Sequence, residues 1–390
     1  MKEIKRTPSG GYAQDWPAYD AAQANEKRHL LTILCALCKE VEDFERSTGR
    51  KPLPLASVLL CLVYKVYLDF SARRCQSFLQ ELRTANLIAA VPKPTVLCEY
   101  MREKALTDIL KGLVMKSSLP LAEMENVFAV DSTGLSVPGK RIWFNKHTGR
   151  REKRRDYIKL HAMCGVRTNI ITGIETTEGT ASDKPYLKQL VEGTARYFEV
   201  SQVSADGGYT SAENFRAVVL AGGIPYIAFH KTNTLDADYK STIWKDMLHL
   251  YKSRHPQFVD RYYQRNNVEA TFHSLKSKFG DRLRSKSLRG QFNEALCKAL
   301  CHNLCVLIHS IYELGIDPTS WADAKLTSRA EAGMIGKAMT PREAELVGER
   351  LPITPPIAIA APQIHTGRRA KRVRFVSSNQ TSLFGELAAD

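Results

Sequence analysis

The sequence predicts an α/β protein in which a mixed-sheet domain follows an all-helical N-terminal domain. Two observations support this fold class. Up to about residue 122, apolar residues recur at helical spacing and no strand-like alternation interrupts them. From about residue 126, β-rich runs are followed by alternating helix and strand patterns, which is typical of a mixed sheet with helices on its faces.

We divide the chain into three parts on this basis. Residues 1–122 form the helical domain and residues 123–315 the mixed-sheet domain. Residues 316–390 form a C-terminal extension, which is Pro-rich, then basic, then polar. Such a composition buries little apolar surface, so we expect a largely extended or disordered basic tail.

The N-terminal domain is expected to contain five helices. The third opens with Ser71, a residue type that caps helix N-termini. The third and fourth helices together have the length of a helix-turn-helix, a DNA-binding motif. A plain helical bundle fits the pattern equally well, and the sequence leaves both open. The helices are expected at residues 18–48, 54–70, 71–87, 94–103 and 105–117.

The second domain is expected to follow the order βββαβαβ, with two further helices after it. The second and third strands form a hairpin around "RTNI". The expected strands and helices lie at residues 126–137, 157–179 (the hairpin), 183–198, 200–211, 211–223, 224–231, 262–276 and 291–314.

Positive charge is concentrated in three short blocks. The chain carries a net charge of +15, and residues 140–159 contribute +7, residues 276–289 +5 and residues 368–374 +5. Such blocks suit salt-dependent contacts with phosphates, so we expect double-stranded DNA as the partner. Three basic loops or tails without a partner are the alternative. The first block contains the residues expected to form a DNA-binding basic loop: Arg150, Arg151, Lys153, Arg154, Arg155 and Lys159.

Two aromatic residues in the first block, Trp143 and Phe144, have an open role. They could stack on a distorted base or simply pack.

The cysteines and the apolar runs indicate a soluble, intracellular protein with no membrane partner. The nine cysteines lie mostly in apolar stretches, and the Cys35/Cys38 pair has no second pair to complete a zinc site. We expect this pair and the stripe Cys297, Cys301 and Cys305 to pack as core residues. The apolar run around residues 58–70 is interrupted by Lys65 and Asp69 and is too short to cross a bilayer.

Three acidic residues form the candidate site. Asp131 and Asp206 follow β-rich runs, and strand ends in open α/β sheets are where ligand sites form. Each aspartate could instead cap a turn. The third acid, Glu269, lies on the predicted helix 262–276.

That helix is predicted to have one polar face and one apolar edge. Tyr262, Glu269 and Lys276 lie on one stripe, with Arg265 and His273 four residues before and after the glutamate. A separate stripe of Val268, Phe272, Leu275 and Phe279 is expected to dock on the core. A carboxylate among cations suits a phosphodiester bound through a divalent metal, because carboxylates hold the metal and basic residues hold the flanking phosphates. The alternative is a surface ion pair between Arg265 and Glu269.

The tetrad Tyr262-x2-Arg265-x3-Glu269-x6-Lys276 resembles the Y-R-E-K signature of bacterial insertion-sequence transposases with a DDE triad, of the insertion-sequence-four/five-like group. The stretches "AVDSTGL" and "SADGGYTSAENF" are similar to that family's two aspartate motifs, and "YIKLH" also fits its pattern. The resemblance covers residues 126–312. The gap from Asp206 to Glu269 is short, so this chain is expected to lack the long β insertion of some relatives.

The resemblance implies a ribonuclease-H-like catalytic core in which Asp131, Asp206 and Glu269 bind two Mg²⁺ ions, for which Mn²⁺ can substitute. Tyr262, Arg265 and Lys276 are then DNA and phosphate contacts near the site, and we add His273 from its place on the same face. The implied function is a transposase that cleaves at its element's terminal inverted repeats and transfers the 3′-OH ends to target DNA. Such a protein is expected to work in the bacterial cytoplasm, at the nucleoid, and at least as a dimer on paired ends.

Other functions remain as alternatives. A nuclease without strand transfer and a non-enzymatic DNA-binding protein fit the same scaffold. A tyrosine recombinase also cuts and joins DNA, but the H-x-x-R at residues 147–150 has no convincing downstream Arg–Tyr arrangement. His161 and Asp183 are expected near the site, with Asp183 as a helix cap rather than a further catalytic acid.

Overall fold

The computed structural model describes residues 15–44, 52–139, 156–230, 232–233, 242–333 and 335, and the backbone alone at 141–145, 150–154 and 242. Residues 1–351 form one compact unit and residues 352–390 a second. Every described residue belongs to the first unit.

The N-terminal part is helical, as predicted. After α5 a short 3₁₀ turn, η1 (Leu119–Leu121), leads into the sheet. The first helix begins where Asp15 accepts a hydrogen bond from the backbone N–H of Ala18, but it ends at Lys39 and not at residue 48. At this end the carboxylate of Glu40 is bound by Lys116 and by the indole of Trp321. The helices are α1 (Trp16–Lys39), α2 (Leu55–Tyr67), α3 (Gln76–Thr84), α4 (Pro94–Tyr100) and α5 (Lys104–Ser118).

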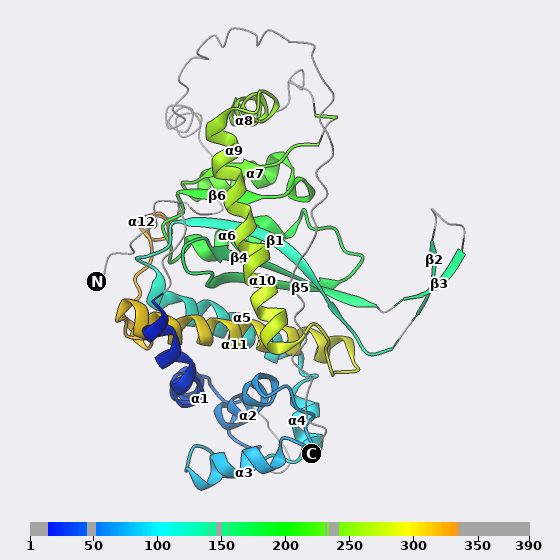
Figure 1. Ribbon diagram of the computed structural model, residues 1–390, viewed down its shortest axis with the longest axis vertical. Coiled ribbons are helices and arrows are strands. Elements are labelled where there is room, and N and C mark those ends of the chain that lie inside the picture. Colours follow the sequence, from blue (N-terminus) through cyan, green and yellow to red (C-terminus); the bar gives the residue numbers. More distant parts are fainter. Residues whose placement is uncertain are drawn as a thin grey trace, which may run out of the picture. The chain divides into compact units, whose positions relative to one another are not determined.

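The second part is built on a five-stranded mixed sheet of order β5-β4-β1-β6-β7, which confirms the predicted mixed sheet (Figure 1). The strand β1 pairs antiparallel with β4 and parallel with β6. The elements are β1 (Val127–Ser136), β4 (Tyr157–Gly165), β5 (Ile171–Glu178), α6 (Tyr186–Ala195), β6 (Gln202–Ala205), α7 (Ala212–Leu220) and β7 (Ile224–Ile227).

The first basic block was expected to be a loop, and this is wrong for its backbone. Residues Arg141–Asn145 (β2) and Arg150–Arg154 (β3) pair as an antiparallel ribbon between β1 and β4. The ribbon extends away from the five-stranded sheet (Figure 1). The run of strand-favouring residues Ile142, Trp143 and Phe144 is the signal that could have predicted it.

The last helices pack against both faces of the sheet. Four follow β7: α8 (Thr242–Lys252), α9 (Pro256–Tyr262), α10 (Asn266–Phe279) and α11 (Leu288–Leu314). Side chains of β1 alternate between two cores: Phe128 and Val130 pack with α6, α7 and α8, and Ala129 packs with α2, α5, α10 and α11. Because the second core also contains the N-terminal helices, the boundary at residue 122 stays a prediction and lies within a shared core.

The helix α11 is the centre of this core. Its cysteine stripe, Cys297, Cys301 and Cys305, is buried as predicted. By length and composition it could cross a membrane, but 78% of its apolar window is buried inside the structure, as expected for a core helix.

The start of the C-terminal extension packs against the rest of the unit. Two short turns follow α11, η4 (Ser320–Asp323) and α12 (Ser328–Glu331). Trp321 is buried, and the N–H of Thr327 donates to the carbonyl of Arg196. The basic block at residues 368–374 lies outside the described residues.

Replacing Asn303 with Leu is expected to lower the free energy of unfolding by about 3 kcal/mol, because four buried polar groups, the Ser117 hydroxyl among them, lose a partner. The Asn303 amide donates to the carbonyls of Val114 and Ile171 and accepts from the N–H of Ile171, so it joins α11 to α5 and to the edge strand β5. Urea unfolding measures the change. Ser310→Ala on the same helix removes one hydroxyl bonded to Val306 and is the control, with a loss below about 1 kcal/mol expected.

Candidate active site

The strand register brings Asp131 and Asp206 together. In the parallel pair of β1 and β6, Val130 lies opposite Ala205, so the next residue of each strand is an aspartate. Neighbouring strands are about 4.8 Å apart. Alternation directs both aspartates to the face that carries α10, because Val130 and Ala205 belong to the opposite core.

Asp131 does not end its strand, which corrects the expectation that both aspartates stand at strand ends. The strand β1 continues to Ser136 because it keeps its antiparallel partner β4. What ends at Asp131 is the parallel pairing with β6. The site therefore lies at the edge where β6 stops.

The predicted single helix 262–276 is interrupted, so that prediction is wrong in one respect. Tyr262 ends α9, residues Tyr263–Arg265 form the 3₁₀ turn η3, and α10 begins at Asn266. The carbonyl of Arg261 accepts hydrogen bonds from Gln202 and Ser204 on β6, at 3.1 and 3.0 Å. These bonds anchor the turn to the strand that precedes Asp206. The apolar edge of α10 is buried as predicted: Val268, Phe272, Leu275 and Phe279.

Arg265 connects the helix acid to the strand acid. Its Nη1 lies 3.0 Å from Oδ2 of Asp131, and its Nη2 lies 2.7 Å from Oε1 of Glu269. The Nε of Arg265 is buried without a hydrogen-bond partner among the described residues. The ring of Tyr262 lies 5.9 Å from the Arg265 Cζ. The expected alternative, an Arg265–Glu269 pair, is present, but it is part of a bridge to Asp131 and not an isolated surface pair.

The environment of Asp131 disfavours its charged form. Its side chain is 17% exposed, whereas that of Glu269 is 55% exposed. Burial raises the pKa of Asp131 to about 6, and the nearby charges of Asp206 and Glu269 act in the same direction. The Ser132 N–H at 2.7 Å and the Arg265 cation oppose this rise. An excess of carboxylate charge gathered at one point favours a bound cation.

Asp183 is not the cap of the helix at residues 183–198, which corrects our prediction. The helix α6 begins at Tyr186, with no side-chain cap. Oδ1 of Asp183 instead accepts from Lys159 Nζ at 2.9 Å and from Ser132 Oγ at 3.1 Å. Ser132 follows Asp131 directly, so Asp183 faces the candidate site. Its partners come from other strands, and no local sequence signal could have shown them.

His161 lies beneath this cluster as a neutral, fully buried side chain. Its Nδ1 is 3.5 Å from Oδ1 of Asp183, and its ring stacks on Tyr186. Its Nε2 bonds Thr177 Oγ1 at 2.9 Å. Burial lowers the pKa of His161 to about 4. The expectation that His161 lies near the site is confirmed.

Two of the other residues predicted to contact DNA, His273 and Lys276, lie on α10. His273 is exposed and bonds Ser277 on its own helix, and Lys276 continues the same face of α10. Lys159 lies in β4, apart from the ribbon, and is engaged with Asp183. The strand β3, of which only the backbone is described, carries Arg150, Arg151, Lys153 and Arg154. The side chains of Trp143 and Phe144 on β2 are likewise not described, and Arg155 lies outside the described residues.

The donor set fits a divalent cation, although the side chains are not closed around one. Three carboxylates converge from β1, β6 and α10, and carboxylate oxygens are the ligands that hard cations prefer. The guanidinium of Arg265 lies between two of them. As the side chains stand, no group of three His, Cys, Asp or Glu residues in the described part of the chain could hold a metal ion. Arg265 would have to release both acids to allow it.

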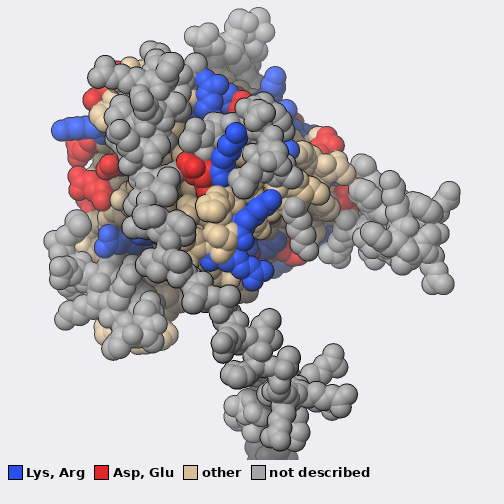
Figure 2. All heavy atoms as spheres, turned by 90° about the horizontal axis from the view of Figure 1, so that it is seen from above, with Lys and Arg blue, Asp and Glu red and all other residues tan. Residues whose placement is uncertain are grey.

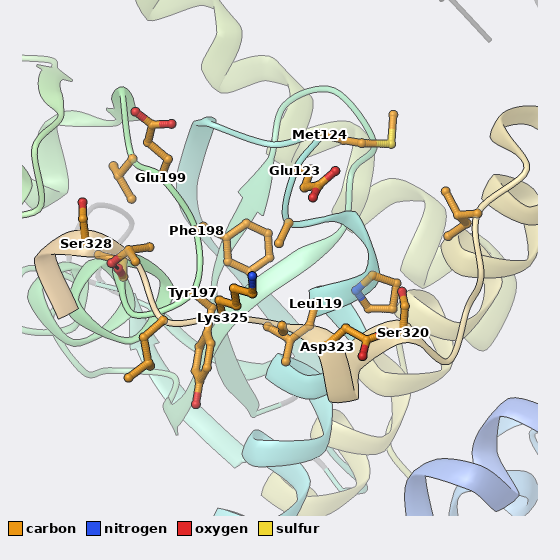
Figure 3. A pocket seen from close by; sticks show the side chains of 18 of the residues that line it. Leu119, Glu123, Met124, Tyr197, Phe198, Glu199, Ser320, Asp323, Lys325 and Ser328 are labelled. Carbon is orange, nitrogen blue, oxygen red and sulfur yellow. Dashed lines mark hydrogen bonds between the residues drawn. The ribbon is translucent and has the colours of Figure 1, made fainter. Parts of the chain in front are cut away.

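The site is open and does not coincide with the large cavity of about 1000 Å³ in Figure 3. That cavity lies between η1, the end of α6 and the segment after α11, and its labelled side chains include Glu123, Glu199 and Lys325. None of the three acids lines it. On the face in Figure 2, Lys and Arg side chains extend across the middle, with acidic side chains among them.

The comparisons with known proteins give one family match. Residues 123–304, just under half of the chain, match the family described as the transposase DDE domain. The matched family is one of transposases. The stretch contains Asp131, Asp206 and Glu269. No curated protein shows a significant sequence match.

One solved structure reported as similar is a piggyBac transposase synaptic complex with hairpin DNA. It is 12% identical, with 84% of this chain and 83% of that chain covered and a TM-score of 0.34. A TM-score this low does not establish a shared fold.

Proposed function

We propose that this chain is a DNA transposase whose mixed sheet is a ribonuclease-H-like core and whose catalytic acids are Asp131, Asp206 and Glu269. The observation that carries the proposal is the convergence of the three acids. Two come from adjacent strands in register, and the third is linked to the first through Arg265. The match of residues 123–304 to the transposase DDE domain supports the same reading.

The three acids are proposed to hold two Mg²⁺ ions, with Mn²⁺ as a substitute. Such ions, when bound, activate the attacking oxygen and stabilise the leaving oxygen of a phosphodiester. The acids hold the metal, and Arg265, once released from Asp131 and Glu269, can pair with a phosphate through its planar fork. Tyr262, His273 and Lys276 line the path of the DNA beside it.

The reaction is proposed to proceed in two displacements at phosphorus. In the first, the oxygen of water attacks the phosphodiester at the element's end, and the bond from phosphorus to the 3′-oxygen breaks. This leaves a 3′-OH and a 5′-phosphate. In the second, that 3′-OH attacks a phosphodiester of target DNA, one bond forms as one breaks, and no reductant or covalent protein link is needed.

The proposed partners are duplex DNA, as terminal inverted repeats and as target, and a second copy of the chain. Pairing two ends requires at least a dimer when the complex is assembled. We propose that this takes place in the bacterial cytoplasm at the nucleoid.

A cleavage and joining assay tests the function. Purified full-length protein is mixed with DNA bearing the inverted repeats that flank its own gene, in Mg²⁺ or in chelator, and target plasmid is added. We expect metal-dependent nicks at the repeat ends, followed by joined products. Nicks without joining would leave a nuclease, and binding without cleavage would leave a DNA-binding protein; either outcome would overturn the proposal.

A further inference from the structure

We propose that a groove between the N-terminal helices and the segment between α10 and α11 binds the phosphate backbone of the same DNA duplex that reaches the acidic site. This rests on the proposed function for the identity of the duplex. The groove has a volume of about 590 Å³. Its walls are α2, the turn before α3, α4 and residues 284–287. The groove lies where the helices predicted to form a helix-turn-helix meet the second basic block, residues 276–289.

The walls of the groove are strongly cationic. Five basic side chains line it and only one acid, Glu99, does so. Arg284 is paired with Asp69, whereas Arg73, Arg102 and Lys286 are exposed and form no ion pair with any described acid. Unpaired guanidinium and ammonium groups around one hollow complement a polyanion. The five are Lys65, Arg73, Arg102, Arg284 and Lys286.

Lys65 is the second, independent observation. It is only 8% exposed, and its ammonium makes no hydrogen bond or ion pair with any described residue, yet it lines the groove. Its aliphatic stem is buried, whereas its ammonium reaches the open side of the groove, where no described side chain pairs with it. An ammonium held at the groove without an ion-pair partner is available to an anion that enters it. A phosphate oxygen is an anion small enough to do so.

The position of the groove favours duplex DNA over an acidic peptide. From Glu269 to Phe279, α10 rises about 15 Å, and residues 284–287 follow within a few residues. Figure 1 shows α10 running from β1 toward the N-terminal helices. One turn of a duplex is about 34 Å long, so a single duplex can touch both the groove and the acids.

The first test is a thiol footprint on the full-length protein. Cys98 lines the groove and is the one exposed cysteine of nine. In chelator, so that no cleavage occurs, maleimide labelling is timed with and without a saturating duplex of arbitrary sequence. Cys98→Ser identifies the labelled site. We expect DNA to slow labelling several-fold. Unchanged labelling under saturating DNA, or protection by inorganic phosphate but not by DNA, would overturn the proposal.

The second test measures how duplex affinity depends on salt. The double variant Arg102→Gln/Lys286→Gln removes two exposed charges of the groove. Each lost phosphate contact is expected to weaken binding on the order of tenfold at 0.1 M salt and to reduce the salt slope by about 0.9. The matched control, Arg28→Gln/Arg216→Gln, removes two exposed charges that do not line the groove. Equal losses in both double variants, or none in the first, would contradict the assignment.

Lys65→Met separates ligand binding from a structural role. If Lys65 contacts a DNA phosphate and does not support the fold, the variant binds DNA more weakly while its melting temperature is unchanged or higher. If Lys65 supports the fold, the melting temperature falls and the salt slope is kept, and the proposal fails.

The proposal for the groove and the proposed catalytic function can be overturned independently of each other. Groove variants that bind and cleave like wild type overturn the groove alone. Wild-type protein that shows the footprint in chelator but never cleaves overturns the transposase function alone.

Discussion

Glu269→Gln is expected to reduce DNA cleavage at least about a thousandfold while leaving duplex affinity nearly unchanged. Under the proposed function Glu269 holds the metal, so its loss removes several kcal/mol of transition-state stabilisation, and each 1.4 kcal/mol is about tenfold in rate. Binding persists because it depends on the basic groups, and Gln keeps the size of the side chain. Single-turnover cleavage and anisotropy binding, measured on the same preparation, give the two numbers.

The chain offers a matched control for this variant. Glu213 is also an exposed helix glutamate in an ion pair, with Lys188 at 2.9 Å, and it lies on α7. Glu213→Gln is expected to cleave like wild type. If Glu269→Gln retained more than about a tenth of the wild-type rate, Glu269 could not be a metal ligand.

Asp131→Asn is expected to stabilise the metal-free protein at neutral pH by up to about 3 kcal/mol, although it destroys the site. The pKa of Asp131 is raised to about 6, against about 3.9 in an unfolded chain. Between these values the folded protein binds the proton more tightly, so this group's contribution to stability falls as the pH rises from about 4 to about 6. Asn cannot ionise and avoids the penalty.

The diagnostic quantity is the difference in stability between the variant and wild type. His161 and His302, whose pKa values burial lowers to about 4, make wild-type stability rise with pH over a similar range and so mask Asp131. In chelator, the difference should be near zero at pH 4 and grow to its full value above pH 6. Asp260→Asn, exposed on α9, is the control. A flat difference would mean that Asp131 carries no such penalty.

Divalent ions should reverse the order of stability between wild type and Asp131→Asn. A ligand that binds only the folded state stabilises it by RT ln(1 + L/Kd), where L is the free ligand concentration, so the effect grows with that concentration. Addition of Mn²⁺ is therefore expected to raise the melting temperature of wild type and not that of Asp131→Asn.

Much of the sheet and two parts of the site followed from local patterns. The β-rich runs before Asp131 and Asp206 predicted two strands, and the order of strands and helices predicted a mixed sheet. The buried stripe of α10 followed from its period. These features depend on periodicity, which a short window of sequence contains.

What the sequence did not reveal depends on contacts between distant residues. The 3₁₀ turn at Tyr263–Arg265 exists beside Gln202 and Ser204, which bind the Arg261 carbonyl from about sixty residues away. The role of Asp183 depends on Lys159 and Ser132 on other strands. The Arg265 bridge to Asp131 joins residues 134 positions apart. A pattern within one helix shows only the half of that bridge that involves Glu269.

The chemistry of the cut end tests the central claim most directly. Wild-type protein is incubated with duplex bearing the flanking inverted repeats, in Mg²⁺ or in chelator, and the products are separated on a denaturing gel before and after protease treatment. A metal-dependent site formed by Asp131, Asp206 and Glu269 predicts nicks only in Mg²⁺, with a free 3′-OH that a polymerase can extend and no protein attached. Equal cleavage in chelator, or a product that shifts after protease treatment because protein was covalently bound, would contradict it.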